Sequence, residues 1–394
     1  MKLLLYSHFF APSVGGVETV VLALSRGLAA LQPPNGSPSE NSQFDITLVT
    51  QTPPGDFDDR ALPFRVIRRP TSAQLWRLIL ATDVVHVAGA ALPPILLGLL
   101  ARKAVVVEHH GFQTICPNGQ LLIEAAGTPC PGHFMAGHHQ TCLRCNSTNG
   151  WPASVKLWLL TFVRRVLCAR VAANITPTRW LGNLVQLPHV VAVPHGLEAS
   201  AVSINDSQPA NPPVIAFLGR LVTTKGVRTL LEAAQILHRE NKSFTLLIIG
   251  DGPERQSLEA LANASRLSNI VRFAGRLDPN PLNAALASAS IVVVPSLGGE
   301  VFGLAVAENM LRGLPVVASD LGAFAEVLGD AGLTFATGDA DALAAQLARL
   351  LDDPELRVTM GQHARERAAH FFDFDRMLAG HAQVYRDVLR RQPV

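Results

Sequence analysis

The chain has 394 residues, of which 48% are hydrophobic, 16% are charged and 6% are aromatic. This length suits two domains of about 100–200 residues each, and the composition excludes a largely disordered chain. The formal net charge of +2 is too small to indicate a protein that binds nucleic acid.

The chain opens with a short apolar segment, MKLLLYSHFF, which leads into Pro12 and the pair Gly15–Gly16. It lacks the length and the cleavage site of a signal peptide, so we interpret residues 2–7 as a first strand. Nowhere does a run of about 18 apolar residues occur, which is the length that a membrane-spanning helix needs. We therefore expect a cytoplasmic protein without a transmembrane helix.

Strand and helix patterns alternate through the first half of the chain. Apolar, β-branched runs predict strands at 2–7, 46–50, 64–67, 84–87 and 105–108, and helical patterns occur at 17–30 and 92–102. A polar loop is expected at 32–43. Such alternation predicts a parallel sheet with helices on both faces.

A second series of the same kind follows a polar segment at 200–213, which we interpret as a linker. Strands are expected at 214–218, 244–249, 271–274, 291–294 and 316–317, and helices at 229–239, 258–265, 281–289, 302–312, 340–352 and 373–391. The predicted fold is α/β, with two Rossmann-like, doubly wound domains facing across a cleft. The expected boundaries are 1–196 and 197–372, with a helix at 373–394 that crosses back to the first domain.

The most informative segment is 291–313, which reads IVVVPSLGGEVFGLAVAENMLRG. A buried strand, a glycine-rich turn and a helix follow one another here, and a helix start preceded by glycines is a common site for phosphate. Glu300 stands at the mouth of the helix and Glu308 lies two turns inside it. Carboxylates beside a phosphate site need a neutral contact such as sugar hydroxyls, so the pattern favours a sugar attached to a phosphate.

Three further loops follow strands at the same predicted edge of this sheet. Arg220 and Lys225 follow the first strand and would place two positive charges on a diphosphate. Gly250-Asp251-Gly252-Pro253 follows the next strand, and Arg272 to Gly275 ends the third. Each loop alone is compatible with a surface charge or a simple turn. Their coincidence at one edge favours a ligand site.

Taken together, these motifs resemble the retaining glycosyltransferases of family 4, which have two Rossmann-like domains in the GT-B architecture. The resemblance extends from the first strand to the last helix. The pair Glu300 and Glu308, in its Pro-Ser…Glu-x-Phe-Gly context, is its most specific element. The other matching residues are Gly15–Gly16, His110–Gly111, Gly219–Arg220, Lys225–Gly226 and Gly250-Asp251-Gly252-Pro253.

The resemblance implies a role for each position in a hexosyl transfer from a UDP-, GDP- or ADP-sugar to a hydroxyl acceptor, with retention. Catalytic roles fall to His110, near the sugar ring or the acceptor, and to Glu300, on the donor sugar hydroxyls. The donor would be bound by Gly15, Gly16, Arg220, Lys225, Gly303, Leu304 and Glu308, the last on the ribose. Because Arg220 and Lys225 would neutralise the leaving diphosphate and no convincing Asp-x-Asp motif occurs, no metal is expected in the reaction.

Two adjacent histidines, His109 and His110, end the strand at 105–108. Neighbouring residues of a strand point to opposite faces, so one of them is expected in the cleft and the other outside it. His110, beside Gly111, fits the family pattern better.

A cysteine-bearing insert is expected at 114–148, within the first domain. Cys116, Cys130, Cys142 and Cys145 fall in it, and the last two form a Cys-x2-Cys knuckle. Four thiolates would suit a structural zinc ion. Free or redox-active thiols and, in a reducing cytoplasm less favourably, a disulfide remain as alternatives.

The segment 151–170, WPASVKLWLLTFVRRVLCAR, is both apolar and basic. One interpretation is a helix that lies on an anionic membrane surface, and the other is an ordinary packed helix. Family members often use lipid-linked or polysaccharide acceptors, which adds peripheral membrane contact as a hypothesis.

Two functions of other classes remain as alternatives. A non-catalytic sugar-nucleotide binding protein would keep the fold without turnover, but the presence of Arg220, Lys225 and both glutamates argues against it. A dinucleotide-dependent oxidoreductase needs Gly-x-Gly-x-x-Gly after a strand, and the first loop lacks that motif.

Overall fold

The computed structural model describes residues 1–13, 15–31, 43–123, 126–145, 150–198 and 210–391. Contacts divide the chain into two compact units: unit 1 is 1–119, 132–196 and 374–394, and unit 2 is 120–131 and 197–373. Residues 120–131 therefore cluster with unit 2, whereas the sequence places the whole insert 114–148 in the first domain. The predicted loop at 32–43 and linker at 200–213 lie largely outside the described residues.

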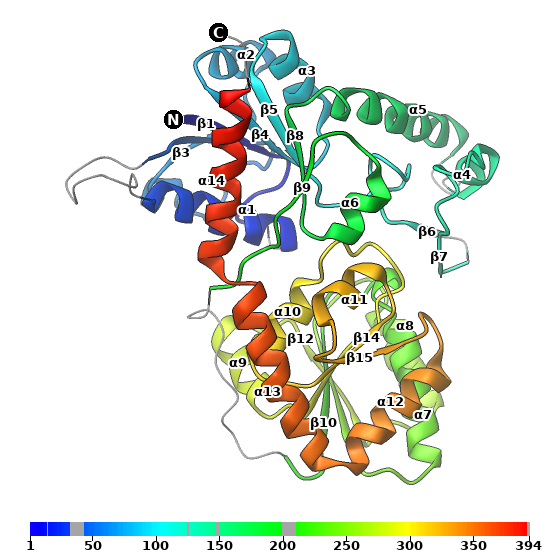
Figure 1. The fold of residues 1–394 in the computed structure, drawn as a ribbon. Coiled ribbons are helices and arrows are strands. Elements are labelled where there is room, and N and C mark those ends of the chain that lie inside the picture. Colours follow the sequence, from blue (N-terminus) through cyan, green and yellow to red (C-terminus); the bar gives the residue numbers. More distant parts are fainter. Residues whose placement is uncertain (14, 32–42, 124–125, 146–149, 199–209, 392–394) are drawn as a thin grey trace. The chain divides into compact units, whose positions relative to one another are not determined.

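Unit 1 is built on a parallel sheet of apolar strands (Figure 1). Its strand order in the described part of the chain is β3-β2-β1-β4-β5-β8-β9. The bounds are β1 Lys2–Ser7, β2 Asp45–Thr50, β3 Arg65–Arg68, β4 Val84–Ala88, β5 Ala104–Glu108, β8 Ala173–Thr176 and β9 Val190–Ala192.

Helices connect these strands and cover both faces of the sheet, as parallel connections require. The C-terminal helix also belongs to this unit: it packs on the first helix, where a Cβ added at Gly27 would meet the side chain of Leu378 at 2.6 Å. The bounds are α1 Gly16–Ala30, η1 Asp59–Ala61, α2 Ser72–Leu80, α3 Leu92–Leu100, α4 His139–Cys145, α5 Trp151–Cys168, α6 Arg179–Val185 and α14 Phe374–Arg390.

The period of two along each strand sorts side chains between the two faces of this sheet. Val85 and Val107 pack into one apolar cluster on one face. His86 and Glu108, each one residue away, therefore point to the opposite face, and α14 covers that face beside β5. A carboxylate and an imidazole are thus placed in the interior by strand geometry alone.

Unit 2 repeats the architecture with the parallel order β12-β11-β10-β13-β14-β15 (Figure 1). A short antiparallel hairpin, β6 Leu122–Ile123 with β7 Thr128–Pro129, belongs to the same unit. The bounds of the sheet strands are β10 Val214–Leu218, β11 Thr245–Ile249, β12 Val271–Gly275, β13 Ile291–Val294, β14 Val316–Ser319 and β15 Leu333–Phe335.

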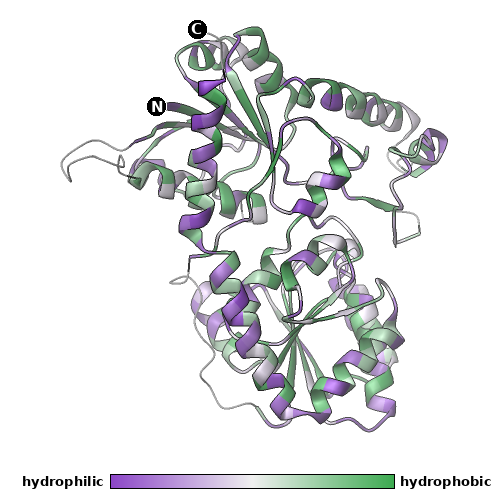
Figure 2. Ribbon diagram, in the orientation of Figure 1, coloured by the Kyte–Doolittle hydropathy of each residue, from purple (hydrophilic) through white to green (hydrophobic). Residues whose placement is uncertain are grey.

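Two apolar layers sandwich this sheet, and Figure 2 shows its strands as predominantly hydrophobic ribbons. Ile215 and Phe217 face a core that includes α7 and α12, whereas Ala216 faces a core that includes α10 and α11. The helix bounds are η4 Thr223–Lys225, α7 Val227–Arg239, α8 Arg255–Ala264, α9 Pro279–Ala287, α10 Leu304–Leu311, α11 Gly322–Leu328, α12 Ala340–Asp352 and α13 Pro354–Phe371.

The predicted α/β class with two parallel sheets is confirmed. Several short or weakly patterned elements were not predicted: α2, α6, β9, α11, β15 and α13. The tail contains two long helices, α13 and α14, separated near Asp373. Of the described helices, none combines the length and the apolar character that a membrane crossing demands.

Candidate functional site

The carboxyl edge of the unit 2 sheet gathers most of the residues singled out by the sequence. Its loops follow β10, β11 and β13, which are neighbours in the sheet. Ligands of doubly wound sheets lie beyond this edge, where loops from adjacent strands meet. The structure therefore brings Lys225, Glu300 and the start of α10 into one neighbourhood.

Lys225 and Glu300 form the central contact of this edge. The Lys225 Nζ lies 2.5 Å from Glu300 Oε1, and Ser296 Oγ donates to the same oxygen at 3.0 Å. Their side chains are 34% and 14% exposed, so both groups remain within reach of a ligand. A cation and a carboxylate thus lie side by side at this edge of the sheet.

The two loops that carry this pair are bound to each other through their backbones. The Leu297 N–H donates to the Thr224 carbonyl at 2.8 Å. Gly226, with a φ of +65°, lies so close that an added Cβ would be 1.9 Å from the carbonyl oxygen of Pro295. Glycine is required here both for its left-handed backbone and for this close approach.

Helix α10 begins directly after Gly303, whose φ of +94° ends the turn. Its first N–H groups, including that of Leu304, have no acceptor earlier in the helix, and the helix dipole adds partial positive charge there. The expected helix start at Phe302 is thus shifted by two residues, because Gly303 adopts a conformation outside the helix. Gly303 and Leu304 lie where an anion would be bound.

Glu308 lies on α10, one turn after its start, and is half-buried. Burial raises the pKa of its carboxyl group, and the guanidinium of Arg312 acts in the opposite direction. Arg312 is itself largely occupied, because it donates to the Glu308 carbonyl and to Asn283 Oδ1. The Glu308 carboxylate is therefore a costly group that packing alone does not explain.

Arg220 follows β10 and is exposed. Its loop packs against the glycine turn after β11: the Leu221 N–H donates to the Asp251 carbonyl at 3.0 Å. An added Cβ at Gly250 would lie 1.8 Å from the Gly219 carbonyl oxygen. The Gly-Asp-Gly turn thus fixes the loop that carries Arg220.

The hairpin β6–β7 was not expected at this edge. The Gly299 N–H donates to the Gln120 carbonyl at 2.7 Å, and a Cβ at Gly298 would meet that oxygen at 3.0 Å. Gly298 and Gly299 therefore admit the backbone of the segment that directly precedes β6. Only the pair of glycines in the sequence hints at this close approach.

In unit 1, Gly15 and Gly16 mark the start of α1, as N-cap and first helical residue. His109 is buried, and its Nε2 lies 2.9 Å from Asn174 Oδ1. His110 instead turns toward Glu108, with 3.3 Å between Nε2 and Oε2. The two side chains thus have different partners, and the prediction that one of them enters the cleft stays a prediction.

Sequence reasoning missed a cluster of buried polar side chains around Glu108. Besides His110, the rings of His86, His195 and His381 approach its carboxylate at 3.2, 3.7 and 3.5 Å. The signal was available: a histidine inside the run VVHV and a glutamate ending VVVE are unusual in buried strands.

The cluster has strong electrostatic consequences. Burial opposes ionisation of Glu108, but attraction by His110 and His381 outweighs it and holds the pKa of the carboxyl well below its usual range. Burial lowers the pKa of His195 to about 3. Burial also lowers the pKa of His86, and the Tyr385 hydroxyl contacts its Nδ1 at 2.8 Å.

No disulfide joins Cys116, Cys130, Cys142 and Cys145 in the structure. Asn118 lies between two of them: Cys116 Sγ donates to its Oδ1 at 2.9 Å, and its Nδ2 lies 3.8 Å from Cys145 Sγ. Cys142 lies on the same helix as Cys145, whereas Cys130 belongs to unit 2. The zinc hypothesis for these cysteines stays a prediction.

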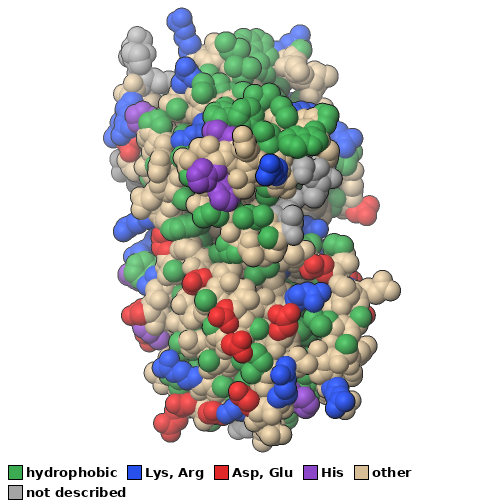
Figure 3. Space-filling view, turned by 90° about the vertical axis from the view of Figure 1, so that its right-hand side faces the viewer, with side chains coloured by type: hydrophobic (Ala, Val, Ile, Leu, Met, Phe, Trp, Pro, Cys, Tyr) green, Lys and Arg blue, Asp and Glu red, His purple; other side chains and the backbone are tan. Residues whose placement is uncertain are grey.

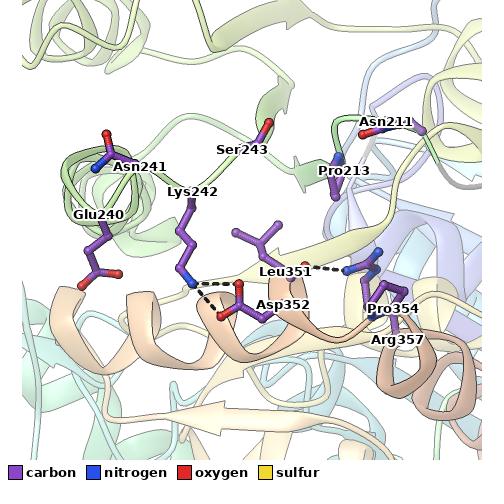
Figure 4. A pocket seen from close by; sticks show the side chains of 11 residues that line it. Asn211, Pro213, Glu240, Asn241, Lys242, Ser243, Leu351, Asp352, Pro354 and Arg357 are labelled. Atoms are coloured by element: carbon purple, nitrogen blue, oxygen red, sulfur yellow. Dashed lines mark hydrogen bonds and ion pairs between the residues drawn. The ribbon is translucent and has the colours of Figure 1, made fainter.

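A pocket at the amino edge of the unit 2 sheet contrasts with this site (Figure 4). Its lining residues precede β10 and β11 or lie around the end of α12. Lys242 is paired there with Asp352 at 2.6 Å, and Arg357 donates to the carbonyls of Leu350 and Leu351. Because these cations are already satisfied and lie opposite the carboxyl edge, we assign no ligand to this pocket.

Comparison with known proteins identifies the family. The family described as "Glycosyl transferases group 1" matches residues 203–367. A phosphatidyl-myo-inositol mannosyltransferase of Mycolicibacterium smegmatis is 32% identical over 282 residues, which cover 69% of each chain. An MMP alpha-(1->4)-mannosyltransferase of Mycolicibacterium hassiacum is 27% identical and covers 99% of both chains.

The fold is also similar to that of a solved structure. The Anabaena protein HepE in complex with UDP-glucose superimposes with a TM-score of 0.73 at 18% identity, covering 98% of this chain and 100% of the other. These matches agree with the two parallel sheets described above. The chain therefore belongs to the group 1 glycosyl transferases, of the family 4 type with the GT-B architecture.

Proposed function

We propose that this glycosyltransferase transfers a hexose from a nucleotide-diphosphate sugar to a hydroxyl acceptor with retention and without a metal in the reaction. The observation that carries the proposal is the Lys225–Glu300 pair beside the start of α10. Lys225 and exposed Arg220 would neutralise the diphosphate, and Glu300 would accept hydrogen bonds from the sugar hydroxyls. The UDP-glucose bound by HepE and the mannosyl transfer named for two relatives support a hexose donor.

The proposed step breaks the bond between the anomeric carbon and the diphosphate oxygen. The acceptor oxygen bonds to that carbon on the same face, and its proton passes to the departing phosphate. Negative charge grows on the diphosphate, where two cations and the N–H groups after Gly303 would stabilise it without reorganising. Glu308 would hold the ribose, and Gly15, Gly16 and His110 would act from unit 1.

A donor screen tests this function. The protein is incubated with UDP-, GDP- and ADP-sugars, with and without a lipid extract, and release of nucleoside diphosphate is measured. Turnover of at least one donor supports the proposal. Tight binding of a nucleotide sugar without acceptor-dependent release would instead indicate a non-catalytic sugar-nucleotide binding protein.

We further propose that the acceptor is lipid-linked and that the protein works at the cytoplasmic face of a membrane. Helix α5 exposes a stripe of large apolar side chains at helical spacing, where a packed helix would bury them. Figure 3 shows hydrophobic side chains gathered on the side of the molecule that includes this helix. The stripe consists of Trp151, Val155, Leu159, Phe162, Val163 and Val166.

Charge and neighbouring surface extend this stripe. Lys156 is exposed on the same helix and Arg170 is exposed two residues after its end, and α3 alongside exposes Leu96 and Leu100. An apolar helix face flanked by cations is typical of a helix that lies in the interface of an anionic membrane. A phospholipid acceptor is also implied by the name of the mannosyltransferase relative.

Vesicle sedimentation tests the membrane contact. Vesicles of phosphatidylcholine with anionic phosphatidylglycerol should retain the protein better than phosphatidylcholine alone. Leu159→Asp should lower the partition coefficient at least about tenfold, because it removes a leucine that the membrane would bury and adds a negative charge that the anionic lipid repels. Leu80→Asp on α2, which alters a similarly exposed leucine elsewhere, should not; equal effects of both variants would refute the assignment to α5.

A further inference from the structure

The buried cluster around Glu108 draws five side chains from four separate segments of unit 1. His86 comes from β4, Glu108 and His110 from the end of β5, His195 from the loop after β9, and His381 from α14. The side chains of Glu108, His86 and His381 are completely buried, and those of His110 and His195 are about 5% exposed. Buried polar side chains normally have hydrogen-bond partners or a bound ion, so a cluster of five of them needs such an explanation.

The contacts in this cluster are not ordinary hydrogen bonds. Both Glu108 oxygens and the Nε2 atoms of His86, His110 and His381 lack an aligned hydrogen-bond partner among the described residues. The distances nevertheless stay between 3.2 and 3.7 Å. Two ligands of a tetrahedral zinc ion, each about 2.0–2.1 Å from the metal, lie about 3.3 Å apart, which matches this range.

The hydrogen positions strengthen the case for a cation. The Nδ1 of His381 lies 2.9 Å from the Met377 carbonyl oxygen, which only accepts, so this nitrogen carries a hydrogen. In the neutral ring, Nε2 then presents a lone pair to Glu108 Oε1 at 3.5 Å. Two acceptors that face each other in the interior need a proton or a metal ion between them, and no Lys or Arg of the described chain pairs with Glu108.

Glu108, His110 and His195 have the geometry to supply that ion. One ligand atom of each lies within 4.8 Å of the others, and this is the one such group of three found among the described residues. Imidazole nitrogen with a single carboxylate favours zinc and related transition ions over magnesium or calcium, which prefer oxygen. We propose that Glu108, His110 and His195 bind a divalent transition-metal ion, with His86 and His381 packed around the carboxylate.

Such an ion would be structural: it would take part in no step of the transfer, although it would share His110 with the proposed active site. It would tie the end of β5 to the loop after β9 and, through His381, to α14. Tyr385 and the Met377 carbonyl fix the rings of His86 and His381 from outside, as outer-shell partners of metal sites do. Binding through Nε2 would also fix the orientation of His110.

The test measures metal directly, in protein made without a polyhistidine tag. The background carries Cys142→Ser and Cys145→Ser, so that thiolates of the insert do not contribute. After zinc loading and dialysis, about one equivalent of zinc should remain by mass spectrometry. Co²⁺ should give visible ligand-field bands without a thiolate charge-transfer band in the near ultraviolet.

Variants locate the ion. Glu108→Gln and His195→Ala should each lower zinc affinity at least about 100-fold, because each removes a ligand rather than an outer-shell partner. His363→Ala, at an exposed histidine of unit 2, should retain the metal. If one variant fails to fold, the cobalt spectrum of the background protein and the zinc affinity of the other variant still show whether this cluster binds the metal.

Two results would overturn the proposal. A folded background protein that binds less than about a tenth of an equivalent and gives no cobalt bands would show that protons alone hold the cluster together. Metal that is present in the wild type but lost with the two cysteine substitutions would assign the ion to the insert instead.

Discussion

The two units both place a carboxylate next to the end of a parallel strand, but in opposite surroundings. Glu108 ends β5 of unit 1, is completely buried and meets only histidines among the described residues. Glu300 follows β13 of unit 2, remains partly exposed and pairs with a lysine. A completely buried carboxylate is inaccessible to a ligand and can contact only the side chains of its own unit. In a partly exposed ion pair, by contrast, each side chain can bind a ligand in place of its partner.

The largest effect is expected at Lys225, where a substitution should lower activity strongly and change stability little. Lys225→Ala should lower kcat/KM for the donor by about 10²- to 10³-fold, because it removes a cation placed where charge develops. The free energy of unfolding should change by less than about 1 kcal/mol, as for other partly exposed pairs. Steady-state kinetics and urea denaturation measure the two quantities.

A matched control comes from the opposite edge of the same sheet. Lys242→Ala also removes a lysine from an ion pair, with Asp352, but beside the pocket of Figure 4. It should change kcat/KM less than about twofold, since a surface pair contributes little. Loss of activity in this variant, or unchanged activity in Lys225→Ala, would place the reaction elsewhere.

Gly226 and Gly89 offer a comparison of backbone constraint between the units. Both have positive φ, but an added Cβ at Gly226 would meet the Pro295 carbonyl oxygen at 1.9 Å, whereas at Gly89 nothing lies within 4 Å. Gly226→Ala should destabilise unit 2 by about 2–4 kcal/mol, through strain and overpacking together. Gly89→Ala should cost about 1 kcal/mol, for the backbone conformation alone.

Tryptophan positions allow the two units to be followed separately. The four tryptophans, Trp76, Trp151, Trp158 and Trp180, all lie in unit 1, so their fluorescence reports that unit. Far-ultraviolet circular dichroism reports both. Gly226→Ala should shift a dichroism transition to lower urea; equal shifts for the two glycine variants would contradict the steric argument.

The site in unit 2 was largely predictable because it follows from short-range rules. Strand, glycine turn and helix start follow one another between Ile291 and Leu304, and parallel strands bring such turns to one edge. The two-residue shift of α10 shows the limit. Gly303 adopts a positive φ that its sequence permits but does not require.

The cluster in unit 1 was not predicted because it depends on long-range packing. His86 and Glu108 share a face of the sheet by register, yet His381 arrives from a helix nearly 300 residues later in the chain. The patterns VVHV and VVVE each predict a buried polar side chain, but neither predicts which residues that side chain contacts. Likewise, nothing local assigns residues 120–131 to unit 2.

The smallest expected effect concerns Glu308 in unit 2. Its carboxylate is partly buried and is intermediate between the buried Glu108 and the partly exposed Glu300. Burial raises its folded-state pKa above the unfolded value of 4.5. The folded protein therefore binds more protons than the unfolded chain between these two values, and its stability falls as pH rises through that window. Above the raised pKa the full cost of the buried charge is present.

Glu308→Gln should remove the cost of the buried charge and should also weaken the binding of the nucleotide. Its unfolding free energy should exceed that of the wild type above the raised pKa, and the difference should shrink as the pH falls toward 4.5. Affinity for the nucleoside diphosphate should fall about 10- to 100-fold, because a charged acceptor for the ribose is replaced by a neutral one. Urea titrations across pH and calorimetry measure both. A variant that is less stable at neutral pH, or that binds nucleotide with unchanged affinity, would contradict this prediction. Either result would show that the Glu308 carboxylate stabilises the fold and does not bind the ligand.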